Sequence, residues 1–141
     1  MPLGNAQYMK TILLVEDSRL HRTVIERDLT RAGYRVVTAA DGEHGLRCAQ
    51  QQLPDLILLD MLLPKITGLD VLRALKNDDL TSAVPIIALT GLSKGNAERL
   101  RKNGVAAFLE KTDQTLQGGS ARLIQLIADV ISQNGQPNKD Q

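Results

Sequence analysis

Short runs of apolar residues recur along this chain, and longer amphipathic segments separate them. Within each run the apolar residues hardly alternate with polar ones, which is typical of strands that are buried on both faces. The sequence therefore predicts five strands, at residues 11–15, 34–37, 56–59, 85–89 and 106–109.

The segments between the runs carry apolar residues at helical spacing, and several are bounded by glycine or by a capping residue. The first has Leu20, Val24 and Leu29 near one face and stops at Gly33, while Asp41 can cap the second. We expect helices at residues 18–32, from 41 onward, and at 69–76, 93–103 and 120–132.

Strand and helix thus alternate through five units. This alternation predicts an α/β fold, a doubly wound five-stranded parallel sheet with helices on both faces. We expect one domain over residues 11–132, preceded by an N-terminal extension (1–10) and followed by a polar C-terminal tail (133–141). No part of the sequence predicts a second domain.

Composition narrows the classes of function. The formal net charge is +1 and only 2% of residues are aromatic, so neither charge nor base stacking favours a direct nucleic-acid partner. No apolar stretch approaches the roughly 20 residues that span a bilayer. The first residues lack the apolar run of a secretory signal. Cys48 has no partner for an internal disulfide and is expected to fill the core. We therefore expect a cytoplasmic protein without membrane contact.

Chemically useful side chains stand at the ends of four predicted strands. Glu16 and Asp17 follow the first, Asp60 the third, Thr90 the fourth and Lys111 the fifth. Parallel strands end at one edge of the sheet, where ligands bind in folds of this kind. Neighbouring carboxylates repel unless a cation intervenes, and Mg²⁺ suits a site that also handles phosphate. A carboxylate nucleophile with a metal, a lysine and a hydroxyl describes formation of an aspartyl phosphate.

Each of these residues also has an ordinary structural interpretation. Asp17 could cap the first helix, and Thr90 could simply close a strand. The combination at four strand ends is much harder to explain in that way. His21 and His44 show no ligand spacing, so we expect ordinary surface or partly buried residues, and Met61 is expected to pack in the core.

The motifs at these strand ends resemble those of the receiver domain of two-component response regulators. The resemblance runs from about residue 10 to about residue 132, and the motifs are ILLVEDS (12–18), LLDMLLP (58–64) followed by Gly68, IALTG (87–91) and FLEK (108–111). Each motif is weak alone, whereas all four in this order are specific. The resemblance is to single-domain, chemotaxis-like regulators, and it implies a flavodoxin-like strand order 2-1-3-4-5.

The resemblance implies a role for each site residue. Asp60 would accept a phosphoryl group from a histidine kinase or a histidine phosphotransfer protein. Mg²⁺ would be bound by Asp17, Asp60 and the backbone carbonyl of Leu62, with Glu16 acting through water. Lys111 would pair with Asp60 and then with a phosphoryl oxygen.

The resemblance also implies a switch. Thr90 would move toward the phosphoryl group, and Phe108 would change rotamer as Thr90 leaves its space. These movements would alter the surface of the fourth helix, fifth strand and fifth helix, where a downstream protein would bind. The fourth predicted helix contains Gly95 and Asn96 in its first turns, so it could shift at low cost. The chain would be a monomer or a phosphorylation-dependent dimer.

Two departures from the family pattern concern loops. Thr112 follows Lys111 where the family commonly has proline. A cis bond without proline costs about 2.5–4 kcal/mol, so we expect a trans bond here and a rearranged loop at residues 112–119. Lys65-Ile66-Thr67 fills the loop before Gly68 and should change loop packing only.

A third departure concerns hydrolysis of the phosphorylated form. Leu62 and Leu92 lie two residues after Asp60 and Thr90. In the family, these positions flank the path of the attacking water, which a leucine side chain cannot orient by hydrogen bonding. We therefore expect slow self-hydrolysis.

Two other functional classes stay open. A phosphatase of the haloacid dehalogenase type also uses a strand-end aspartate, a threonine and a lysine, but it needs an acid where this chain has Leu62. A binding module could keep the fold without the chemistry. A flavin binder favours phosphate-cradling residues where Glu16 and Asp17 stand, and a degenerate receiver usually loses a site residue.

Overall fold

The computed structural model describes residues 9–91, 95–111 and 120–135. Its parallel strands form one sheet in the order β2-β1-β3-β4-β5, which confirms the predicted fold class and strand order. The strands are β1 (Thr11–Val15), β2 (Arg35–Ala39), β3 (Leu56–Asp60), β4 (Ile86–Thr90) and β5 (Ala107–Glu110).

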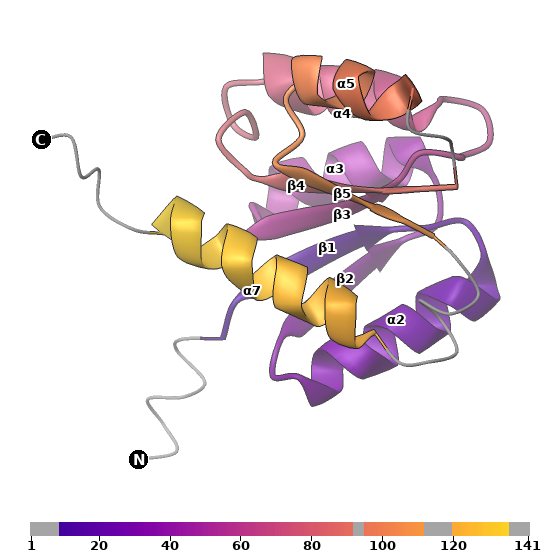
Figure 1. The fold of residues 1–141 in the computed structure, drawn as a ribbon. Coiled ribbons are helices and arrows are strands. Elements are labelled where there is room, and N and C mark those ends of the chain that lie inside the picture. The colour runs from indigo at the N-terminus through magenta and orange to yellow at the C-terminus, as the bar shows by residue number, and fades with distance from the viewer. Residues whose placement is uncertain (1–8, 92–94, 112–119, 136–141) are drawn as a thin grey trace, which may run out of the picture.

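Helices cover both faces of this sheet (Figure 1). One face carries three helices, and α2 and α7 lie on the other. The helices are α2 (Arg19–Arg31), α3 (Gly42–Gln52), α4 (Gly68–Asn77), α5 (Gly95–Lys102) and α7 (Ala121–Gly135).

Successive residues of each strand enter two separate cores. On β1, Leu13 and Val15 face α3, α4 and α5, while Ile12 and Leu14 face α2 and α7. β3 and β4 are buried along their whole length. Burial on both faces explains why the strands appear in the sequence as unbroken apolar runs.

Three helices begin next to the carboxyl end of the sheet with a side-chain cap. Ser18, Asp41 and Thr67 each accept a hydrogen bond from the backbone N–H three residues further on, at 3.3, 2.8 and 3.1 Å. The predicted cap at Asp41 is therefore confirmed. These caps fix where each chain segment turns away from the strand end, and so fix the loops that carry polar residues.

Two details of the predicted helices are wrong. Leu20 was expected on the buried face of the first helix, but its side chain is 70% exposed. The Ser18 cap starts the helix so that Ile25 and Leu29 face the sheet instead. The last helix continues to Gly135, beyond the predicted end at Ser132. Within the described ranges, no helix is both long and apolar enough to cross a membrane.

Candidate functional site

The carboxyl ends of four strands meet at one edge of the sheet. The register pairs Val15 with Leu59, so Glu16 and Asp60 follow in step at the ends of β1 and β3. On the neighbouring strand β4, Leu89 pairs with Asp60, and buried Thr90 comes next. The Lys111 N–H donates to the carbonyl of Thr90 at 2.7 Å, which ties the end of β5 to the end of β4.

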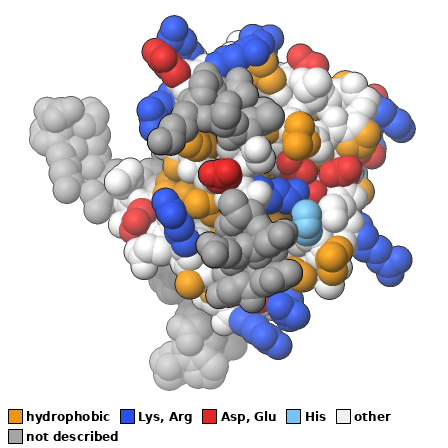
Figure 2. Space-filling model, turned by 45° about the vertical axis from the view of Figure 1, so that its right-hand side comes forward, with side chains coloured by type: hydrophobic (Ala, Val, Ile, Leu, Met, Phe, Trp, Pro, Cys, Tyr) orange, Lys and Arg blue, Asp and Glu red, His pale blue; other side chains and the backbone are white. Residues whose placement is uncertain are grey.

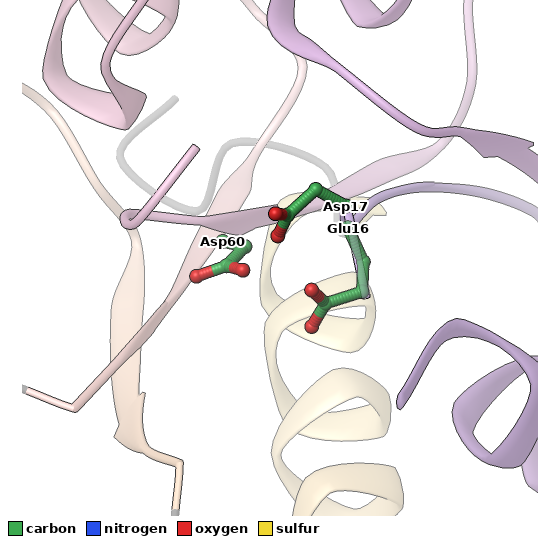
Figure 3. A group of neighbouring side chains, drawn as sticks. All are labelled: Glu16, Asp17 and Asp60. Carbon is green, nitrogen blue, oxygen red and sulfur yellow. The ribbon is translucent and has the colours of Figure 1, made fainter. Parts of the chain in front are cut away.

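Three carboxyl groups share this edge. One oxygen of each of Glu16, Asp17 and Asp60 lies within 4.8 Å of the others, and the groups turn toward the same space (Figure 3). Glu16 and Asp60 are buried, whereas Asp17 is exposed. The α2 helix is capped by Ser18 rather than by Asp17, so the capping interpretation of Asp17 is wrong.

Lys111 joins two of these carboxylates. Its Nζ lies 2.5 Å from Glu16 Oε1 and 3.2 Å from Asp60 Oδ2. Burial alone would lower the pKa of Lys111, but the hydrogen bond to Glu16 and the charge of Asp60 outweigh burial and raise it. Lys111 therefore stays charged. The interaction with Glu16 did not follow from the sequence, which indicated only Asp60 as its partner.

Glu16 is the most perturbed acid of the group. Burial raises its pKa to about 7, with Asp60 adding to the rise and the hydrogen bond from Lys111 opposing it. Its Oε2 accepts the N–H of Ser18 at 3.0 Å. Three carboxylates and one lysine leave an excess of negative charge, and an oxygen-only donor set of this kind fits a hard divalent cation such as Mg²⁺.

Asp60 is held through both of its carboxylate oxygens. Oδ1 accepts the Leu62 N–H at 3.0 Å, and Oδ2 faces Lys111. The following loop packs tightly, because a Cβ on Gly68 would lie 2.5 Å from Met61 Cα and 2.8 Å from the Asp60 carbonyl oxygen. The loop also turns through Lys65, whose φ of 67° is left-handed. Met61 packs in the core, as predicted.

Two residues of α2 approach the site without having been predicted to do so. Arg22 Nη1 donates to the backbone carbonyls of Glu16 at 2.8 Å and Asp17 at 3.4 Å. His21 is partly buried, as expected, and its Nδ1 lies 3.8 Å from Glu16 Oε1. Both residues lie one helical turn after Ser18, which caps α2 next to the end of β1. Residues at this spacing can turn back toward the strand end, and this spacing was the sequence signal that could have identified them.

The remaining expected site residues are more scattered. The Leu62 side chain is 61% exposed at the rim. Phe108 is half-buried on β5, an edge strand. Leu92, the Lys111–Thr112 bond and the loop at 112–119 lie outside the described residues, so the expectations for them remain predictions. In the view of Figure 2, acidic and basic side chains and a histidine gather among exposed hydrophobic groups.

Solved structures share this arrangement of strands and helices. The chemotaxis response regulator CheY4 of Vibrio cholerae matches with a TM-score of 0.78 and 29% identity, over 86% of this chain and 98% of that one. The receiver domain of the sensor histidine kinase PA1611 of Pseudomonas aeruginosa matches with a TM-score of 0.76 and 36% identity, over 88% and 98%. That structure has a magnesium ion coordinated in its active-site cleft.

Sequence comparison leads to the same family. The polar-differentiation response regulator DivK of Brucella anthropi is 36% identical over 103 residues, which are 72% of this chain and 84% of that protein. Residues 12–117 match the response regulator receiver domain. The chain belongs to the response regulator receiver family, whose members are signalling switches.

Proposed function

We propose that Asp60 accepts a phosphoryl group from a histidine kinase or a histidine phosphotransfer protein. The observation that carries the proposal is the environment of the Asp60 carboxylate. Oδ1 is held by the Leu62 N–H and Oδ2 faces Lys111, while Glu16 and Asp17 add negative charge that a divalent cation would offset. A buried carboxylate is thus fixed in orientation beside a permanent cation.

Each residue of the site has a separate role in the proposed phosphoryl transfer. A carboxylate oxygen of Asp60 forms a bond to phosphorus as the phosphorus–nitrogen bond of the donor imidazole breaks, and the electron pair leaves with the imidazole. Lys111 neutralises an oxygen of the transferred group, and the Thr90 hydroxyl donates to another. Mg²⁺, when held by Asp17, Asp60 and the Leu62 carbonyl with Glu16 acting through water, would offset charge on the phosphoryl oxygens.

We propose that the added charge switches a surface for partners. Phosphorylation adds roughly −1.5 to −2 charge, which attracts Thr90 and Lys111. Thr90 and Phe108 then move, and the surface of α5, β5 and α7 changes for a downstream protein. The protein would act in the cytoplasm, as a monomer or as a dimer formed on phosphorylation. Leu62 and Leu92 would make self-hydrolysis slow.

The test uses acetyl phosphate as a small phosphodonor with Mg²⁺. Intact mass should rise by one phosphate in the wild-type chain and stay unchanged in Asp60→Asn. Asp55→Asn is the matched control, because Asp55 is an exposed aspartate whose carboxylate accepts the Thr11 N–H, at the start of β1. Equal phosphorylation of Asp60→Asn and wild type would refute the assignment of Asp60.

A further inference from the structure

Arg101 and Phe108 form a contact between a helix and the edge of the sheet. The Arg101 guanidinium carbon lies 5.0 Å from the centroid of the Phe108 ring. Arg101 is exposed in the last turn of α5, and Phe108 is half-buried on β5. A guanidinium at this distance over an aromatic face is a favourable cation–π pair. The pair therefore links the position of α5 to the orientation of one ring.

The Phe108 ring also borders a hollow at the edge of the sheet. The hollow has a volume of about 250 Å³, and Phe108 and Leu109 form its β5 side. Arg122, Gln125, Leu126 and Asp129 of α7 form the other side. Phe108 packs as well against the core cluster that contains Leu100 and Val105. A change in the orientation of this ring would alter the contact with α5 and the shape of the hollow together.

We propose that Arg101 is a latch that holds Phe108 in its present orientation and so opposes the switch. This inference rests on the proposed phosphorylation of Asp60. If phosphorylation turns the ring, the Arg101–Phe108 contact must be given up. An exposed cation–π pair of the usual strength favours the latched state about two- to fivefold in population. By linkage, the same factor is lost from the affinity of the site for a phosphoryl group.

Charge on α5 alone does not explain this contact. Arg99, Arg101 and Lys102 all stand in the last turn of the helix, where positive charge is favourable. Among the described residues, Arg101 is the one whose guanidinium lies over the Phe108 ring. Arg99 is also exposed, so Arg99→Ala removes the same charge from the same turn and provides the matched control. Alanine is the best helix former, so neither substitution should unfold α5.

A single phenylalanine in the sequence allows the orientation of the Phe108 ring to be followed without overlap from other phenylalanines. Protein labelled with ring-¹³C phenylalanine therefore reports Phe108 alone. Beryllofluoride with Mg²⁺, a stand-in for a phosphoryl group on a carboxylate, is titrated while the ring signal is followed by NMR. We expect Arg101→Ala to bind beryllofluoride about two- to fivefold more tightly than wild type. Arg99→Ala should match wild type, and Arg101→Lys should fall between the two.

The outcomes separate the latch from the phosphorylation. Equal affinity of Arg101→Ala and Arg99→Ala would overturn the latch and leave the role of Asp60 intact. A ring signal that stays still while wild type binds beryllofluoride would overturn it too. Failure of wild type both to bind beryllofluoride and to gain phosphate mass would instead overturn the proposed function, and the latch with it.

Discussion

Lys111 lies closer to Glu16 than to Asp60, with Nζ–oxygen distances of 2.5 and 3.2 Å. The lysine that faces Asp60 is therefore shared with a second buried acid. Glu16 itself is about half protonated near pH 7, because burial raises its pKa to about 7. The charge of the site at physiological pH thus depends on one glutamate.

The raised pKa of Glu16 predicts how stability changes with pH. Between the unfolded value of 4.5 and about 7, folded Glu16 keeps a proton that the unfolded chain has lost. Rising pH therefore favours unfolding over this range. In the absence of divalent cations, the free energy of unfolding of wild type relative to Glu16→Gln should fall by about 1–3 kcal/mol from about pH 5 to pH 8.

Urea denaturation at the two pH values, in EDTA, measures this difference. Asp55→Asn provides the control, because it removes an exposed carboxylate at the opposite end of β3, outside the group that contains Glu16. A constant difference between wild type and Glu16→Gln across the range would contradict the prediction.

Arg22 should influence the binding of Mg²⁺ without touching the ion. Its side chain holds the carbonyls of Glu16 and Asp17 and so sets the direction of the chain that carries both acids. Loss of such a supporting contact typically weakens metal binding about 10- to 100-fold, and we expect Arg22→Met to do so. Arg22→Lys should recover part of the affinity.

Calorimetric titration with Mg²⁺ measures the affinity of each variant. Arg19→Met removes an exposed arginine from the first turn of the same helix and controls for the change in charge. If Arg22→Met and Arg19→Met bound Mg²⁺ equally well, the supporting role of Arg22 would be wrong.

Gly68 should tolerate no side chain. An added Cβ would meet backbone atoms of Met61 and Asp60 at 2.5 and 2.8 Å, and backbone moves aside only at a cost. We expect Gly68→Ala to lower the free energy of unfolding by about 1–3 kcal/mol. A Cβ on Gly91 meets no atom of the described residues within 4 Å, so Gly91→Ala should be close to neutral. Equal unfolding midpoints in urea for the two variants would count against this packing argument.

Leu62 should slow the loss of phosphate from Asp60. Its exposed hydrocarbon side chain cannot orient a water molecule. We expect Leu62→Asn to shorten the lifetime of the phosphorylated protein by roughly tenfold. Intact mass followed over time, after removal of acetyl phosphate, gives the lifetime. Leu80→Asn changes a leucine of similar exposure elsewhere and should have no effect. Unchanged decay in Leu62→Asn would exclude the idea.

The sequence predicted the sheet well because burial on both faces leaves a simple signature. Each of β1, β3 and β4 appears as an apolar run, and the polar residues at their ends necessarily meet at one edge of a parallel sheet. The Asp41 cap was also predictable, since its contact with the His44 N–H is local. Boundaries shifted by one to three residues, because the ends of elements depend on hydrogen bonds with neighbouring strands and loops.

Contacts between distant segments were not predictable in the same way. The Lys111–Glu16 pair joins residues 95 positions apart, and the chain pattern does not indicate which of two neighbouring acids a lysine will approach. Arg22 could equally have been a solvated helix residue. The Arg101–Phe108 contact depends on the distance between α5 and β5, which packing determines. The charged and polar residues at the strand ends identified the site in the sequence. Which side chains contact one another there depends on the three-dimensional packing of the elements that carry them.

The direction of the strands has a practical consequence for attachment. All strands run toward the edge that carries Asp60, and the described chain both enters β1 and leaves α7 at the opposite pole of the molecule (Figure 1). The segments that precede residue 9 and follow residue 135 therefore leave the described domain on the side away from the acidic edge. The protein could be immobilised through either end for binding measurements while Asp60 stays open to a phosphodonor.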